Sequence, residues 1–166
     1  MAPYVQAIAV TGFTGVMTAA AFEDFRRLVI PNLLPVALCV LWLIYFAAAP
    51  SLYGGLAAIG CAAAVFFVGA LLFARGWLGG GDVKLLSAAT LWAGPAGLGP
   101  LLMFTAVIGG ALALLWLTPT GRHLIVWTRN LLSSPVSTEG GLAAPIPYGV
   151  SIAAAGLIVI LPPYLG

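Results

Sequence analysis

The sequence predicts an all-α polytopic membrane protein with six transmembrane helices, and three observations support this fold class. Of its 166 residues, 63% are hydrophobic and only 6% are charged, and the mean hydropathy is +1.15. Soluble domains, by contrast, carry charge on about a quarter of their residues. The apolar residues also form segments of the length that a bilayer core of about 30 Å requires. Finally, the basic residues cluster in every second connection between these segments.

The expected spans follow one another with mostly short connections. The first three cover residues 4–22, 33–49 and 55–74, and the fifth and sixth cover residues 98–117 and 146–161. The fourth span has only twelve residues, 83–94, before the chain is broken by the sequence Gly94-Pro95-Ala96-Gly97, which corresponds to about 18 Å of helix. Because such a helix is too short to cross unaided, we expect it to begin below the headgroups, in a thinned or water-filled region.

The positive charges predict the orientation of the chain. Two Lys or Arg residues lie between spans one and two, two between three and four, and two between five and six, whereas the other connections and both ends have none. Cytoplasmic loops carry the excess of positive charge in membrane proteins. This pattern therefore places three basic loops in the cytoplasm and both termini outside, and it requires the short fourth segment to be a crossing.

The longest connection, residues 118–144, contains an amphipathic stretch. Residues 122–132 predict an interfacial helix, in which Leu124, Ile125 and Trp127 are apolar. Two interpretations of this connection stay open: a lid or membrane-surface segment, and a simple connector. We find no internal repeat and no separate soluble domain, so residues 1–166 are interpreted as a single transmembrane domain.

Several functional classes receive no support from the composition. Cys39 and Cys61 lie within predicted spans and form no Cys-x-x-Cys pair, so neither a zinc site nor a redox motif is expected. His123 has no neighbouring residues with which to bind a metal. The net charge of +2 is too small to suggest a nucleic-acid partner. We therefore expect a lipid-embedded protein with no metal and no cofactor.

Asp24 and Asp82 make up half of the four acidic residues, and both lie where apolar segments end. Asp24 follows the first span and Asp82 precedes the fourth, so the predicted topology brings both to the cytoplasmic side at similar depth. The glycines at 79–81 permit tight backbone turns and close approach by another chain. Two carboxyl groups that share a site tend to hold one proton between them. One can then take a proton from water while the other hydrogen-bonds a substrate carbonyl, as in aspartic proteases.

Peptide hydrolysis is the candidate reaction, but the residues alone leave alternatives open. Asp24 is also placed to pair with Arg26 or Arg27, and Asp82 is placed to pair with Lys84 or to cap the fourth helix. Intramembrane carboxylates also serve as ion sites or proton relays in small transporters. A noncatalytic scaffold of a secretion machine is a third hypothesis.

Three short motifs resemble those of type IV prepilin peptidases, which belong to the Gly-x-Gly-Asp aspartyl intramembrane proteases. The stretch Asp24-Phe25-Arg26-Arg27-Leu28-Val29-Ile30-Pro31-Asn32 resembles their aspartate-to-Ile-Pro-Asn signature. Gly79-Gly80-Gly81-Asp82-Val83-Lys84 resembles their Gly-x-Gly-Asp-x-Lys signature. Pro147-Tyr148-Gly149 is similar to a Pro-aromatic-Gly element of the same family. The resemblance covers essentially the whole predicted membrane domain.

Within that family, the chain is similar to the small CpaA/TadV-like peptidases of tight-adherence (Flp) pilus systems, with archaeal preflagellin peptidases as the alternative. The resemblance implies an endopeptidase of the inner (plasma) membrane that cleaves the prepilin leader at the cytoplasmic boundary. Its expected partners are the prepilin, the lipid bilayer and the pilus assembly machinery. Larger relatives also methylate the new N-terminus and carry paired Cys-x-x-Cys motifs, which this sequence lacks, so the resemblance supports cleavage without supporting methylation.

The resemblance also implies roles for individual residues. Asp24 and Asp82 are the expected catalytic pair, and Gly79 and Gly81 are expected to shape the loop before Asp82. Lys84 matches the lysine of the family signature, and two roles stay open for it: tuning the catalytic pair, and anchoring the helix at the interface.

Five further residues are expected to support the site. Arg27 either positions the substrate or serves only as a cytoplasmic charge that sets the topology. Pro31 and Asn32 are expected to shape the turn into the second span, because proline is favoured at helix starts. Pro147 and Gly149 are expected to bend the sixth span.

Overall fold

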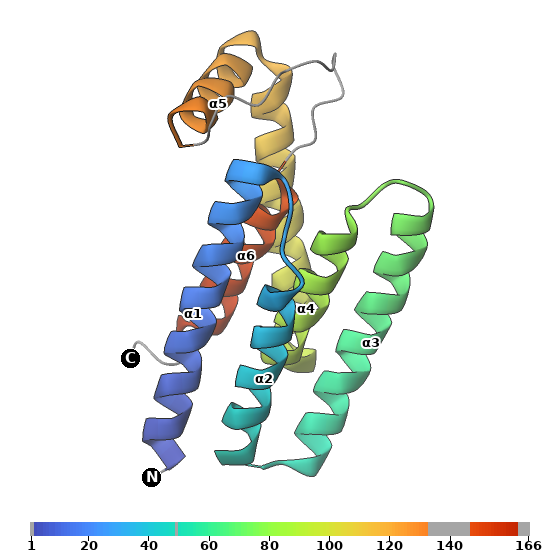
Figure 1. Cartoon of the computed structure of the whole chain (residues 1–166). Helices are drawn as coiled ribbons and strands as arrows, with labels where there is room; N and C mark the ends of the chain where they lie inside the picture. Colours follow the sequence, from blue (N-terminus) through green and yellow to red (C-terminus); the bar gives the residue numbers. More distant parts are fainter. Residues whose placement is uncertain (1, 49, 133–146, 163–166) are drawn as a thin grey trace.

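The computed structural model describes residues 2–48, 50–132 and 147–162, and these ranges contain helices and connecting turns but no strand. The predicted all-α class is confirmed. Figure 1 shows the elements in chain order, which are α1 (Ala2–Arg27), α2 (Leu33–Ala48), α3 (Leu52–Ala74), α4 (Gly80–Leu117), α5 (Pro119–Leu132) and α6 (Tyr148–Ile160).

Helix α4 consists of two arms that meet at Gly94. This residue has φ 59° and ψ −171°, which is not a helical conformation, and Figure 1 shows α4 turning back on itself partway along its length. Pro95 then opens the second arm, a position where its missing N–H costs no helical hydrogen bond. The first arm, residues 80–93, is only about 21 Å long. The expected short fourth segment is therefore present, although it begins two residues before Asp82.

The chain is a polytopic membrane protein. Among the described residues, three helices are both long and apolar enough to span a bilayer (Pro3–Arg27 within α1, α3 and α4), and α2 and α6 are shorter apolar helices. Large apolar side chains such as Tyr53 and Phe67 point outward and are exposed, as expected where lipid replaces water. Counting the two arms of α4 separately, residues 2–48, 50–132 and 147–162 form six apolar helical segments, in agreement with the predicted spans.

The amphipathic stretch forms a helix, α5, which starts three residues earlier than expected; its place at the membrane interface stays a prediction. Leu124, Trp127 and Leu131 are exposed on it, whereas Ile125 is buried. The remainder of that connection, and Ile146 at the expected start of the sixth span, lie outside the described residues.

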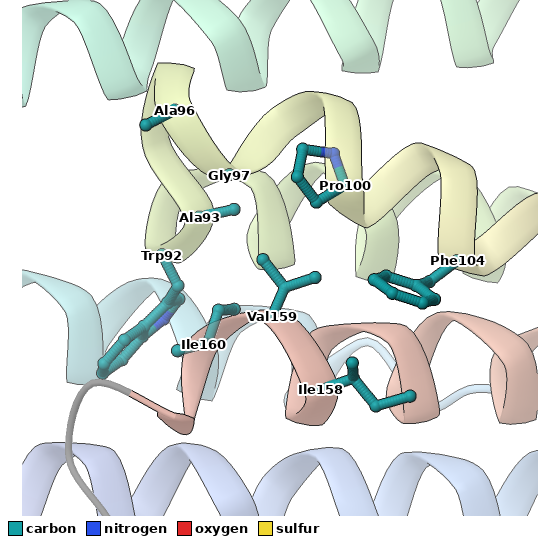
Figure 2. Close-up of a pocket in the computed structure, with 9 residues that line it drawn as sticks. All are labelled: Trp92, Ala93, Ala96, Gly97, Pro100, Phe104, Ile158, Val159 and Ile160. Atoms are coloured by element: carbon teal, nitrogen blue, oxygen red, sulfur yellow. The ribbon is translucent and has the colours of Figure 1, made fainter. Parts of the chain in front are cut away.

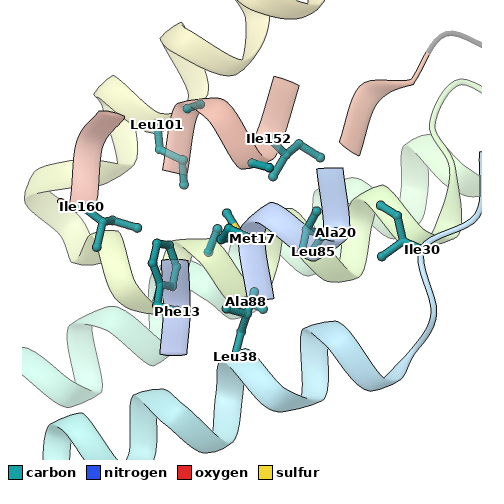
Figure 3. Packing of buried hydrophobic residues seen from close by; sticks show 13 residues of the cluster. Phe13, Met17, Ala20, Ile30, Leu38, Leu85, Ala88, Leu101, Ile152 and Ile160 are labelled. Atoms are coloured by element: carbon teal, nitrogen blue, oxygen red, sulfur yellow. The ribbon is translucent and has the colours of Figure 1, made fainter. Parts of the chain in front are cut away.

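The core lies between α1, α2, both arms of α4, and α6 (Figure 3). Phe13 and Met17 of α1 are fully buried in it. Trp92 ties three helices together, because its ring lies 4.8 Å from that of Phe13 and its Nε1–H donates to the Leu38 carbonyl at 3.0 Å. Figure 2 shows Trp92 beside the turn of α4 and next to Ile160 of α6, where an apolar cavity of about 460 Å³ lies.

One end of the bundle collects the chemically interesting residues, and we call it the aspartate end. Here α1 and α3 end, and α2, α4 and α6 begin (Figure 1). At this end Arg26 and Arg27 lie in the last turn of α1, Arg75 is the C-cap of α3, and Lys84 lies in the first turns of α4. The structure thus brings to one end of the bundle four of the six basic residues from which the orientation was predicted.

Candidate active site

Asp24 lies in the last turn of α1, and its side chain is only 5% exposed. Helix α1 ends three residues later, because Leu28 adopts φ 54°, the left-handed conformation that commonly terminates helices. The Asp24 carboxylate Oδ2 accepts a hydrogen bond from the Val150 N–H at 3.3 Å. Val150 belongs to the first turn of α6, where backbone N–H groups have no partner within the helix. A buried carboxylate of α1 therefore satisfies a backbone donor at the start of α6.

Gly149 permits this contact. A Cβ atom at position 149 would lie 2.8 Å from Cγ and from Oδ2 of Asp24, and 2.8 Å from Cδ1 of Ile30. These distances are well below van der Waals contact, so a residue with a side chain does not fit without displacing Asp24, Ile30 or α6. Glycine at this position lets the backbone of α6 lie directly against the aspartate.

Asp82 lies in the first turn of α4, three residues after the N-cap residue Gly79. Its half-buried carboxylate accepts a hydrogen bond from the backbone of Gly79, and a Cβ atom at Gly79 would come within 2.7 Å of its Oδ2. An acidic residue at this third position that reaches back to the N-cap is one half of a capping box. Gly79, and not Asp82, is therefore the N-cap, and Asp82 caps the helix from inside its first turn.

The aspartates of α1 and α4 come together at the aspartate end, where the carboxylate of Asp24 acts electrostatically on that of Asp82. Ile30 packs between the start of α4, which carries Asp82, and the start of α6, which contacts Asp24. It is buried and lies against Gly81, where a Cβ atom would be 3.0 Å from the Ile30 Cβ, and also against Gly149. One side chain from the α1–α2 connection thus sets the spacing between the starts of α4 and α6.

Lys84 and Asn32 form a second link at this end. The Lys84 Nζ donates to the Asn32 Oδ1 at 2.8 Å, so this bond joins the first turns of α4 to the start of α2. The Pro31 carbonyl accepts from Leu34 N–H at 3.1 Å, and the Asn32 carbonyl accepts from Val36 N–H at 3.3 Å. Pro31 and Asn32 therefore form the turn into α2, and Lys84 contacts that turn.

Of the remaining supporting residues, Arg27 forms a surface ion pair and Pro147 precedes α6. Arg27 is 67% exposed and pairs with Glu23, with Nε and Oε2 3.2 Å apart, a surface ion pair that contributes little to stability. Pro147 is the N-cap of α6. The expectation that Pro147 bends the sixth span is wrong, because the helix begins only at Tyr148.

Two contacts at the site were not predicted. Ile30 was noted only as part of a motif, although the Ile-Pro-Asn sequence was the available signal for it. The Val150 amide left no signal, since every residue except proline has a backbone N–H. Among the described residues, no three His, Cys, Asp or Glu side chains group together as metal ligands, and a metal-free site stays a prediction.

Comparisons with known proteins agree with the motifs. The model of the type IV leader peptidase family matches residues 12–114, which include Asp24 and Asp82. The Prepilin leader peptidase/N-methyltransferase of Xanthomonas campestris pv. campestris is 30% identical over 151 residues, covering 86% of this chain and 46% of that protein. The chain thus spans about half the length of this curated relative. No solved structure matches the chain. Because the family model covers more than half of its residues, the chain belongs to the type IV leader peptidase family.

Proposed function

We propose that this protein is a membrane aspartic endopeptidase that removes the leader peptide of prepilins, with Asp24 and Asp82 as its catalytic pair. The observation that carries the proposal is the convergence of these two carboxyl groups, from helices far apart in the sequence, at one end of an apolar bundle. Family membership supports the same conclusion. We further propose that the substrates are prepilins of the tight-adherence (Flp) type and that they are cleaved without methylation, since residues 1–166 contain no paired Cys-x-x-Cys motif.

The proposed reaction uses a water molecule held between the two carboxyl groups. The ionised carboxylate takes a proton from water as the water oxygen attacks the scissile carbonyl carbon, and the protonated carboxyl group hydrogen-bonds the carbonyl oxygen. The tetrahedral intermediate then collapses. Its C–N bond breaks, and the leaving nitrogen receives the proton that the first carboxylate had accepted. This reaction needs no cofactor.

The environment of the pair suits this chemistry. The Val150 N–H holds Asp24, and the Gly79 backbone holds Asp82, so both carboxyl groups are oriented before a substrate arrives. Ile30 limits the space between α4 and α6. A pre-oriented pair of this kind lowers the barrier because it needs little rearrangement during the reaction.

The proposed substrate has a short basic leader in the cytoplasm, followed by an apolar helix in the inner (plasma) membrane. Its scissile bond lies near the cytoplasmic boundary, with a small residue, typically glycine, before it. If the basic residues at the aspartate end face the cytoplasm, that bond and the carboxyl pair lie at the same depth. A cation or proton site in a transporter ordinarily lies near the bilayer midplane, whereas both aspartates here occupy terminal helix turns.

Co-expression with a Flp-type prepilin tests the proposal, with the size of the pilin as the readout. We expect the wild type to shorten the prepilin, and Asp24→Asn and Asp82→Asn to reduce processing by about 100-fold or more, the usual loss when a general acid or base is removed. Glu23→Gln is the matched control, because Glu23 neighbours Asp24 in sequence but pairs with Arg27. The proposal fails if both Asn variants enter the membrane fraction normally and still process the prepilin.

A further inference from the structure

An apolar groove of about 630 Å³ opens on the side of the bundle between α2 and α3. The two helices are joined at one end and diverge toward the aspartate end, where α4 begins between them (Figure 1). Each of the three helices contributes one face to the groove. Examples of the lining residues are Val36 and Val40 of α2, Ala63 and Phe66 of α3, and Ser87 and Leu91 of α4.

One end of the groove lies near the candidate active site, although neither Asp24 nor Asp82 lines it. Lys84 and Asn32, which are hydrogen-bonded to each other, line its end. Lys84 lies two residues after Asp82 on α4, and Asn32 lies two residues after Ile30, which packs at the starts of α4 and α6. The groove is therefore polar at the aspartate end and apolar along the rest of its length.

This distribution sets the chemistry of an occupant. Val36 and Phe66 are about half exposed, so in a membrane the groove walls meet lipid and offer apolar contact along the groove. From Lys84 to Leu91, the floor formed by α4 extends about 10 Å, or two helical turns. Small residues such as Ala63 and Ser87 leave room for another backbone to approach closely, as at helix interfaces in membranes. The groove thus suits an apolar helix whose polar end lies at the aspartate end.

We infer that this groove docks the apolar helix of the prepilin substrate and delivers its cytoplasmic end to Asp24 and Asp82. The inference rests on the proposed function and adds the binding surface. In the docked state, the N-terminal end of the substrate helix lies at the aspartate end, and the leader residues before the helix offer carbonyl groups to the donors of Lys84 and Asn32. A lipid acyl chain also fits the apolar walls, with its headgroup at the aspartate end. Lipid occupancy of the groove is therefore the competing outcome.

Filling the groove with a large side chain tests the inference. Ala63 and Ala64 are neighbours on α3, and both are exposed, but only Ala63 lines the groove. With a Flp-type prepilin as the probe, we expect Ala63→Trp to raise KM by about tenfold or more with a smaller change in kcat, the pattern of lost substrate binding. Ala64→Trp is the control and should leave KM within about twofold of the wild-type value.

Disulfide cross-linking supplies a second measurement. Cys39 lines the groove and Cys61 does not, and both are free. A prepilin with one cysteine in its apolar helix is mixed with the Asp82→Asn variant, and copper-phenanthroline accepts the two electrons released as the two thiols join. We expect a cross-link in the Cys61→Ala variant that is lost in the Cys39→Ala variant.

The outcomes separate this inference from the proposed function. If the wild type cleaves the prepilin, Ala63→Trp leaves KM unchanged and no cross-link to Cys39 forms, the docking site is overturned and the peptidase stands. That combination is also the result expected for a groove occupied by lipid. If the wild type cleaves no prepilin, the proposed function fails first and the docking site fails with it.

Discussion

Replacing Gly149 by alanine tests how α6 holds Asp24. The new Cβ atom would lie 2.8 Å from Cγ and Oδ2 of Asp24 and from Cδ1 of Ile30, whereas ordinary contacts begin at about 3.4 Å. At least one of these groups must therefore move by more than half an ångström. Overpacking of this kind costs about 1–3 kcal/mol.

The protein can relieve this strain in two ways, and the effect of each can be measured. If the strain is relieved by moving Asp24 in the active state, 1–3 kcal/mol corresponds to a rate reduction of about 5- to 150-fold. If α6 moves away instead, the protein unfolds at a lower temperature. We expect Gly149→Ala to reduce the initial rate of prepilin cleavage by about 10- to 100-fold, and to lower the melting temperature of the purified protein.

Gly110→Ala is the matched control. Gly110 lies in the second arm of α4, and a Cβ atom there meets nothing within 4 Å. Alanine at this position should leave cleavage unchanged and stabilise the helix by up to about 1 kcal/mol. The packing of α6 against Asp24 would be refuted if Gly149→Ala matched the wild type in both cleavage rate and melting temperature.

Two further predictions concern the helices that carry the site. Gly94→Ala should lower the free energy of unfolding by about 1–3 kcal/mol, because φ 59° with ψ −171° is a conformation that alanine rarely adopts. Gly99→Ala is the control, since a Cβ atom there meets open space. Equal unfolding midpoints for the two variants would contradict the prediction. Trp92→Phe removes the 3.0 Å hydrogen bond to the Leu38 carbonyl but keeps an aromatic ring beside Phe13. It should cost about 0.5–1.5 kcal/mol, the range found for hydrogen bonds within membranes, and an unchanged midpoint in detergent unfolding would show that this bond does not stabilise the bundle.

Much of the helical architecture could be predicted because its causes are local. The length of each apolar run follows from the thickness of a bilayer, and Gly94 followed by Pro95 interrupts any helix that passes through them. Counting the segments was then enough to bring Asp24 and Asp82 to the same end of the bundle. The boundaries were less accurate: α4 begins at Gly80, because Asp82 caps it from inside the first turn, and α6 begins at Tyr148, because Pro147 precedes the helix.

The details of the site were not predictable in the same way. Gly149 and Lys84 were expected to support the site from their motifs, yet the groups that they contact, Asp24 and Asn32, lie more than fifty positions away in the sequence. One hydrogen-bond partner of Asp24 is the backbone amide of Val150. Residue types in a sequence do not indicate which backbone amide will donate such a bond. Ile30 separates α4 from α6 only because two glycines from distant parts of the chain remove the side chains that would otherwise occupy its space.

Short stretches of sequence were therefore enough to predict the membrane class, the order of the helical segments and the end of the bundle at which the two aspartates lie. Hydropathy, segment length and charge are properties of such stretches, and each stretch can be interpreted separately. The contacts between helices were needed to establish that α6 starts against Asp24, that Ile30 spaces the site, and that α2, α3 and α4 leave a groove that ends near it. Those features depend on how helices distant in sequence pack, and packing is decided by the shapes of all the side chains together.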